Sequence, residues 1–156
     1  MPFCGGALHY ACYERKPRGG PPDLPEAYAV RFSLCCGQPG CRRRVLPPSV
    51  LFWGRRVYFA AVFLVVSALR QGRTRGYTVR RLHKLFGLTR PTLARWIRYF
   101  REQFAHSRGF QRLRGRLLPP VAVKRLPGAL IERFEKAHGA YEVALIACLK
   151  TLALGP

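Results

Sequence analysis

The sequence predicts a mainly α-helical protein with a small β module at its N-terminal end. Residues 1–48 hold five of the six cysteines together with turn-rich Gly/Pro segments. Residues 49–110 repeat apolar side chains at helical spacing, and residues 128–154 contain a further apolar helical segment. We therefore expect a cysteine-rich module over 1–48, a three-helix domain over 49–110, and a basic linker with a C-terminal helix over 111–156.

Two short strands are expected in the cysteine-rich module. Residues 29–34 alternate apolar and polar side chains and lead directly into a pair of cysteines, while residues 8–13 form a weaker candidate strand. A module of about 45 residues rarely folds on its apolar core alone. A bound metal ion is therefore expected to hold the two strands together.

The cysteine spacing predicts a zinc-ribbon-like site, because four N or S ligands close a structural zinc site. Cys4, followed by two glycines, resembles the second half of a zinc knuckle, and Cys36-x4-Cys41 fits a second knuckle. The ligand expected three residues before Cys4 is missing. The site is therefore complete only if His9 or Cys12 joins it, or if the chain begins further upstream. The alternative is a module that has lost its metal and is held together by packing.

No secretory signal opens the chain, so metal binding explains these cysteines better than disulfides do, and we expect a cytoplasmic protein. Cys35 and Cys148 are expected to be buried small hydrophobes. The apolar run over residues 57–69 is about 13 residues long, whereas spanning a bilayer takes about 20. We interpret residues 55–69 as a buried support helix.

Residues 77–86 predict a short helix with Val79, Leu82, Leu85 and Phe86 on one face. The residues that flank this helix favour a helix-turn-helix. Thr78 can cap its first turn, Gly87 supplies a flexible turn after it, and Leu88 is the apolar residue that closes the turn.

A second helix is predicted over residues 90–104, with Thr89 as its cap. Its buried face is expected to be formed by Leu93, Trp96, Ile97 and Phe100. Its exposed face is expected to be formed by Arg90, Thr92, Arg95 and Arg98, with Tyr99 at the margin. Arginine can donate two hydrogen bonds to a guanine edge, and threonine can contact a thymine methyl group or a phosphate. The same interface is expected to include Arg73, Arg75, Arg80 and Arg81.

The charge of the chain favours a nucleic-acid partner. There are 28 Lys+Arg against 7 Asp+Glu, which gives a formal net charge of +21 and a pI near 11.1. A phosphate backbone is the usual partner of such a surface, and an anionic membrane surface is its main competitor. We expect a double-stranded DNA-binding protein; the alternatives are an RNA-binding or nucleoprotein scaffold protein, a transcriptional regulator, or a membrane-surface protein.

An enzyme is not expected. A two-metal nuclease or transposase needs converging carboxylates, but Asp23 is the only aspartate, and Glu132 and Glu135 are better interpreted as surface ion pairs. No nucleophile with a base and no phosphate-binding glycine loop can be recognised. No small-molecule substrate is therefore expected.

The segment over residues 128–154 is expected to form one helix. It carries more apolar side chains than a single buried face needs. It can pack against the three-helix core, or it can form a homodimer that pairs two recognition helices on a two-fold site.

Taken together, residues 13–20, the run Cys36-x4-Cys41-Arg-Arg-Arg-x-x-Pro-Pro-Ser49 and the helix-turn-helix resemble small bacterial proteins related to transposase N-terminal DNA-binding regions. The resemblance covers roughly residues 3–104. It implies recognition of DNA ends, or a stand-alone accessory of a mobile element with a transposase as partner, in a nucleoid-associated location.

Overall fold

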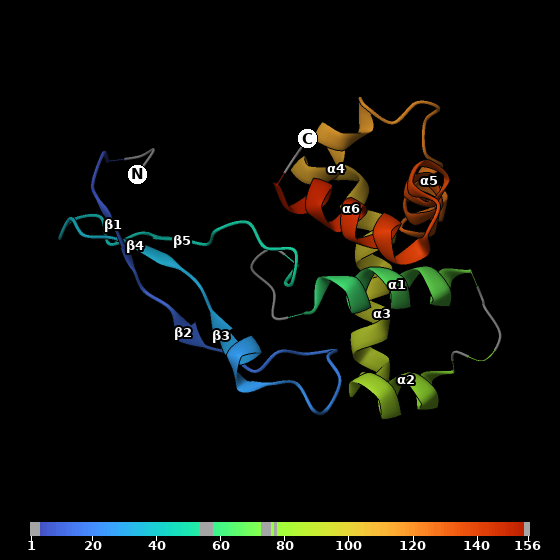
Figure 1. Ribbon diagram of the computed structural model, residues 1–156, viewed down its shortest axis with the longest axis horizontal. Helices are drawn as coiled ribbons and strands as arrows, with labels where there is room; N and C mark the ends of the chain where they lie inside the picture. The colour runs from blue at the N-terminus through green and yellow to red at the C-terminus, as the bar shows by residue number, and fades with distance from the viewer. Residues whose placement is uncertain (1–3, 54–57, 73–75, 77, 155–156) are drawn as a thin grey trace.

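A computed structural model describes residues 4–53, 58–72, 76 and 78–154 of the chain. The α-helices of this part are α1 (Ala60–Gln71), α2 (Val79–Phe86), α3 (Arg90–Arg98), α4 (Arg108–Arg114), α5 (Gly128–His138) and α6 (Tyr141–Leu154). The helix predicted over residues 90–104 is α-helical only over α3; it runs on as a π-helix, η2 (Tyr99–Gln103), and a 3-10 turn, η3 (Phe104–His106). The strands are β1 (Leu8–Tyr10), β2 (Tyr13–Glu14), β3 (Val30–Arg31), β4 (Leu34–Cys36) and β5 (Arg44–Val45). The fold is therefore mainly α-helical with small N-terminal sheets, as the sequence predicts, and the strands lie to one side of the helices (Figure 1).

The N-terminal strands form two antiparallel sheets, of order β1-β4-β5 and β2-β3. The two predicted strand segments do pair, with Tyr10 opposite Leu34 and Tyr13 opposite Arg31. The segment predicted as one strand is nevertheless split between the two sheets. The split lies at Ser33, a buried residue whose hydroxyl donates to the carbonyl of Ala11 and whose own carbonyl accepts from the Ala11 N–H at 2.9 Å.

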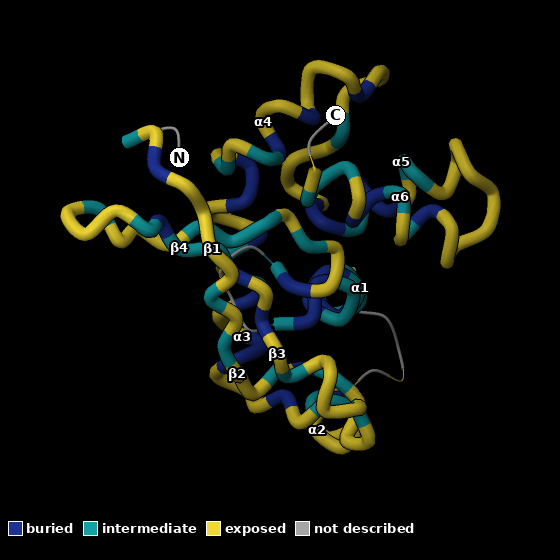
Figure 2. Tube along the Cα trace, turned by 60° about the vertical axis from the view of Figure 1, so that its left-hand side comes forward, coloured by how far each residue is buried: buried dark blue, intermediate teal, exposed yellow. Residues whose placement is uncertain are grey.

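The core of the protein is centred on the contact between α1 and α3. The ring of Phe63 in α1 lies 4.9 Å from the ring of Trp96 and 4.9 Å from that of Phe100, measured between centroids. All three side chains are at most 1% exposed. Figure 2 shows buried segments within the helices, whereas β1 is exposed along its whole length.

The support helix begins later than predicted. The helix begins at Ala60, because Phe59 has extended backbone angles and the residues before it pair with other segments. Tyr58 forms a bridge with Arg18, and Phe59 forms one with Phe52. The first residues of the predicted helix, 55–57, lie outside the described residues.

The prediction of a single C-terminal helix is wrong. The segment breaks at Gly139, whose φ of +78° ends α5, and α6 leaves at a bend of 115°. Both helices contribute buried side chains to the core, among them Leu130 and Cys148. Glu132 forms the expected surface ion pair, with Arg125. Of the described helices, none is by itself long and apolar enough to cross a membrane; α5 and α6 have the required length and composition only as a bent pair.

The Pro/Gly-rich loop after β2 packs into the helical core. The carbonyl of Arg18 accepts a hydrogen bond from the N–H of Phe59 at 3.2 Å. Gly19 is buried at a φ of +80°, and a Cβ added there would lie 3.1 Å from the Cη2 atom of Trp96. The loop runs on beside α2 (Figure 1). The two predicted N-terminal units are thus in direct contact, whereas the boundary between them stays a prediction.

Replacing Gly19 should loosen this contact. Gly19→Ala would place a side chain in the left-handed region and against Trp96, so we expect the free energy of unfolding to fall by about 1–3 kcal/mol. Urea denaturation followed by circular dichroism measures it. The control is Gly115→Ala, at a φ of −64° with nothing within 4 Å of the added Cβ. Equal stability of the two variants would contradict the described docking of the loop.

Candidate functional site

The α2–α3 connection has the local features that the sequence predicts. The Thr78 hydroxyl accepts from the N–H of Arg81 at 3.2 Å and caps α2. Gly87 ends α2 at a φ of +61°, and Leu88 is 2% exposed. These contacts give two short helices joined by a tight turn. One expected core residue of α2 is misplaced, because Leu85 is 43% exposed and lines an open cleft beside the Pro/Gly-rich loop.

One face of α3 is turned away from the core and is basic. Arg90, Ala94 and Arg98 are each four residues apart, which places them on one stripe of α3, and all three are exposed. The opposite side is buried and is held by the contacts of Trp96 and its neighbours in the core. Neither α2 nor α3 contains an acidic residue. We call this stripe the outward face of α3.

The structure corrects the predicted exposure of Thr92. This residue is only 7% exposed, because it lies on the flank of α3 that faces the loop of Gly19. Its Oγ1 atom accepts from the guanidinium of Arg95 at 3.2 Å and lies 3.1 Å from Oγ1 of Thr89. Thr89 occupies the cap position by its backbone angles, but its side chain makes no capping hydrogen bond. Thr92 therefore positions Arg95 on this flank and does not belong to the outward face.

The remaining predicted interface residues are spread over three places. Arg80 and Arg81 are exposed on α2, and the guanidinium of Arg81 donates to the carbonyl of Gly76 at 3.3 Å. Tyr99 is partly buried, and its hydroxyl accepts from Trp53 Nε1 at 3.1 Å. The other two predicted residues, Arg73 and Arg75, lie outside the described residues.

The second candidate site is a cluster of three thiols. The Sγ atoms of Cys4, Cys36 and Cys41 all lie within 4.8 Å of one another, and those of Cys4 and Cys36 are 3.4 Å apart. Cys36 ends β4 and is fully buried, Cys41 lies in the turn before β5, and Cys4 precedes β1. These three predicted ligands are therefore brought together and can bind a metal ion. Of the residues that the structure describes, no other such cluster emerges.

The backbone beside the cluster makes two turns of unusual geometry. Gly5 follows Cys4 at a φ of +66°, and Arg42 follows Cys41 at a φ of +43°. Arg42 is the only described non-glycine residue with a positive φ, so this turn is held in an unusual geometry. Next to Gly5, a Cβ added to Gly6 would lie 2.7 Å from the Sγ atom of Cys36, so only glycine leaves room for that sulfur.

The structure does not bring the expected fourth ligand to the cluster. His9 pairs with Cys35 across β1 and β4, and successive side chains of a strand alternate in direction, so His9 faces away from the Cys36 thiol. Cys12 is exposed and lies outside the cluster. Cys35 is partly exposed and not buried as expected. Cys148 is fully buried as expected, and burial raises the pKa of its thiol to about 12.

The position of the loop over residues 17–29 does not follow from the sequence pattern. Together with α2, the turn and Arg95, this loop encloses an open cleft of about 810 Å³. The paired glycines Gly19 and Gly20 were the available signal, since adjacent glycines often mark a close approach of the backbone to other groups. Their partners, Trp96 and Phe59, are distant in the sequence and could not be assigned from it.

No protein-family model, no curated protein and no solved structure matches the chain.

Metal binding at the thiol cluster can be tested with Co²⁺, whose thiolate complexes absorb in the near ultraviolet. The reduced protein should bind a single ion, and Cys4→Ser, Cys36→Ser and Cys41→Ser should each abolish most of the absorption, because each removes one sulfur ligand. Cys12→Ser and Cys35→Ser are the matched controls and should bind as the unaltered protein does. A loss of binding in Cys12→Ser, or no binding by the unaltered protein, would contradict the cluster as the site.

Proposed function

We propose that the protein is a non-catalytic DNA-binding protein, in which α2 and α3 act as a helix-turn-helix and α3 enters the major groove. The observation that carries this proposal is the outward face of α3, where Arg90 and Arg98 flank the small residue Ala94 on an exposed stripe. The opposite face is locked in the core by Trp96 and Phe100, so the arginines project from a fixed helix.

The chemistry of this face suits reading of base edges. A helix fits the major groove, and a guanidinium can donate two hydrogen bonds to O6 and N7 of guanine. Ala94, between the two arginines, has no long side chain that would keep the helix axis away from the base edges. The short connection at Gly87 joins α2 to the N-terminal end of α3, and the exposed Arg80 and Lys84 of α2 can contact neighbouring phosphates.

The net charge of the chain supports the same partner. A charge of +21 implies that binding releases many counterions, so affinity should fall steeply as salt rises. The same charge would also support RNA binding without groove reading, which is the alternative proposal. The two differ in whether a particular duplex sequence is preferred.

For the thiol cluster we propose structural zinc. Three cysteine sulfurs around one point suit a thiophilic ion of this kind, and the fourth ligand is not among the described residues. Bound zinc would join the segment of Cys4 to the β4–β5 hairpin and so hold a module that has few buried apolar side chains of its own. Association with a mobile element, a transposase partner, homodimer formation and nucleoid location stay predictions.

Selection from a random duplex library at two salt concentrations tests this function. We expect one enriched motif and an affinity that falls steeply with salt. Arg98→Lys keeps the charge but loses the two-pronged donor, so it should relax the preference at one position of the motif by about 1–3 kcal/mol. Lys136→Ala, which removes an exposed charge on α5, should leave the motif unchanged.

Two results would contradict the proposal. If Arg98→Lys selects the same motif as the unaltered protein, α3 is not the element that reads the bases. The second result is steep salt dependence without an enriched motif, together with structured RNA that competes as well as duplex DNA does. It would favour the alternative of nucleic-acid binding without groove reading.

A further inference from the structure

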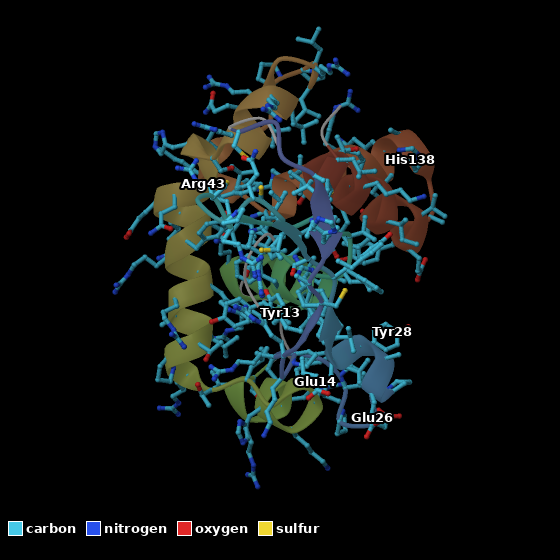
Figure 3. The ribbon with its side chains drawn as sticks, turned by 90° about the vertical axis from the view of Figure 1, so that its left-hand side faces the viewer. Tyr13, Glu14, Glu26, Tyr28, Arg43 and His138 are labelled. Carbon is cyan, nitrogen blue, oxygen red and sulfur yellow. The ribbon has the colours of Figure 1, made fainter. Side chains whose placement is uncertain are left out.

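A second basic surface lies on the flank of α3, beside the outward face. A groove of about 470 Å³ separates this flank from the end of β2. Three arginines line it: Arg15 from the N-terminal module, and Arg95 and Arg98 from α3. Among the described residues that line the groove none is acidic. Tyr13 and Glu14, labelled in Figure 3, form the strand that leads into Arg15. We call this feature the Arg15 groove.

The walls of the Arg15 groove are fixed by the fold. Tyr58 packs against Trp96 with the ring centroids 5.0 Å apart, and both residues line the groove. The hydroxyl of Tyr99, a third lining residue, is engaged by Trp53 Nε1. The indole nitrogen of Trp96 is buried without a hydrogen-bond partner among the described residues. The groove is therefore a rigid surface with aromatic walls and polar groups.

The guanidinium groups are also positioned. The backbone N–H of Arg15 donates to the carbonyl of Ala29 at 2.7 Å, which extends the β2–β3 pairing to this residue. The Arg15 guanidinium lies 5.3 Å from the centroid of the Tyr13 ring, on which Arg44 also stacks. Across the groove, Arg95 is held by Thr92. Positive charges gathered along one groove repel each other, and a bound anion relieves that repulsion.

We infer that the Arg15 groove binds one phosphodiester group of the DNA strand that lies beside α3. This inference rests on the proposed function. Guanidinium groups match the oxygens of a phosphate in pairs, and Gln103 offers a further amide donor at the end of the groove. The Arg15 groove adjoins the outward face at Arg98. A DNA strand whose bases contact the outward face therefore passes beside the groove. The N-terminal module thus belongs to the DNA interface and does more than support the fold.

This assignment divides the arginines of α3 by role. Arg90 faces the bases, Arg98 lies where the outward face meets the groove and faces the bases as well, and Arg95 and Arg15, which line the groove, contact the backbone. A phosphate contact fixes the register of the protein on the duplex but carries no sequence information. Loss of Arg15 should therefore weaken binding to all duplexes equally and leave the preferred motif intact.

The test compares Arg15→Gln with Lys16→Gln, because each removes one exposed charge and Lys16 does not line the groove. With the selected duplex, Arg15→Gln should bind about tenfold more weakly and reduce the slope of log affinity against log salt by about 1. Duplexes carrying a single uncharged methylphosphonate then locate the contact. A methylphosphonate at one position of the duplex should lower the affinity of the unaltered protein and of Lys16→Gln. The same methylphosphonate should leave the affinities of Arg15→Gln and Arg95→Gln unchanged.

The possible failures can be told apart. If the unaltered protein selects a motif but Arg15→Gln behaves like Lys16→Gln, or stays sensitive at every methylphosphonate position, the groove is not a phosphate site although the proposed function stands. If the unaltered protein binds no duplex, the proposed function fails and the groove inference falls with it. Thermal melting of each variant confirms that its fold is intact.

Discussion

The contact between Phe63 of α1 and the aromatic side chains of α3 is the interaction on which the rest of the structure depends. Trp96 and Phe100 both pack against Phe63, and Trp53 packs its ring against Phe63 and Phe100 as well. Aromatic pairs of this kind contribute about 0.5–1.5 kcal/mol each beyond the burial of their area. Because these rings lie on one side of α3, they determine which side of the helix faces solvent and therefore where its arginines point.

The same cluster also receives the N-terminal module. Gly19 approaches the ring of Trp96, and Arg31, a buried residue of β3, places its guanidinium 4.8 Å from the centroid of the Phe52 ring. Burial lowers the pKa of the Arg31 guanidinium, and packing over an aromatic face offsets part of the cost of burying the charge. The loop of Gly19 and α3 thus meet in one core.

The sequence predicts the features that depend on local spacing. The buried face of α3 follows from its helical period, the cap at Thr78 and the turn at Gly87 follow from residue type, and the thiol cluster follows from glycines and cysteines at knuckle spacing. Thr92 was assigned to the wrong face because its burial depends on a loop about 70 residues earlier in the chain. Gly139 is a helix-ending signal, but apolar residues at helical spacing before and after it concealed the break between α5 and α6.

Features that join distant segments could not be predicted in this way. The Arg15 groove combines Arg15 after β2, Tyr58 two residues before α1, and residues of α3, and only the tertiary fold brings them together. The fourth ligand of the thiol cluster is a similar case. The cysteine spacing leaves open whether His9 or Cys12 is the fourth ligand. The register of β1 on β4 places His9 on the face of the sheet opposite the Cys36 thiol.

The central claim is that the outward face of α3 lies against duplex DNA. Ala94→Glu tests it most directly, because it places a carboxylate at the centre of that face without touching the core. The control is Ala137→Glu, an equivalent exposed substitution on α5. We expect Ala94→Glu to weaken duplex binding on the order of a hundredfold with an unchanged melting temperature, and Ala137→Glu to bind nearly as well as the unaltered protein. Equal affinities for the two variants would contradict it.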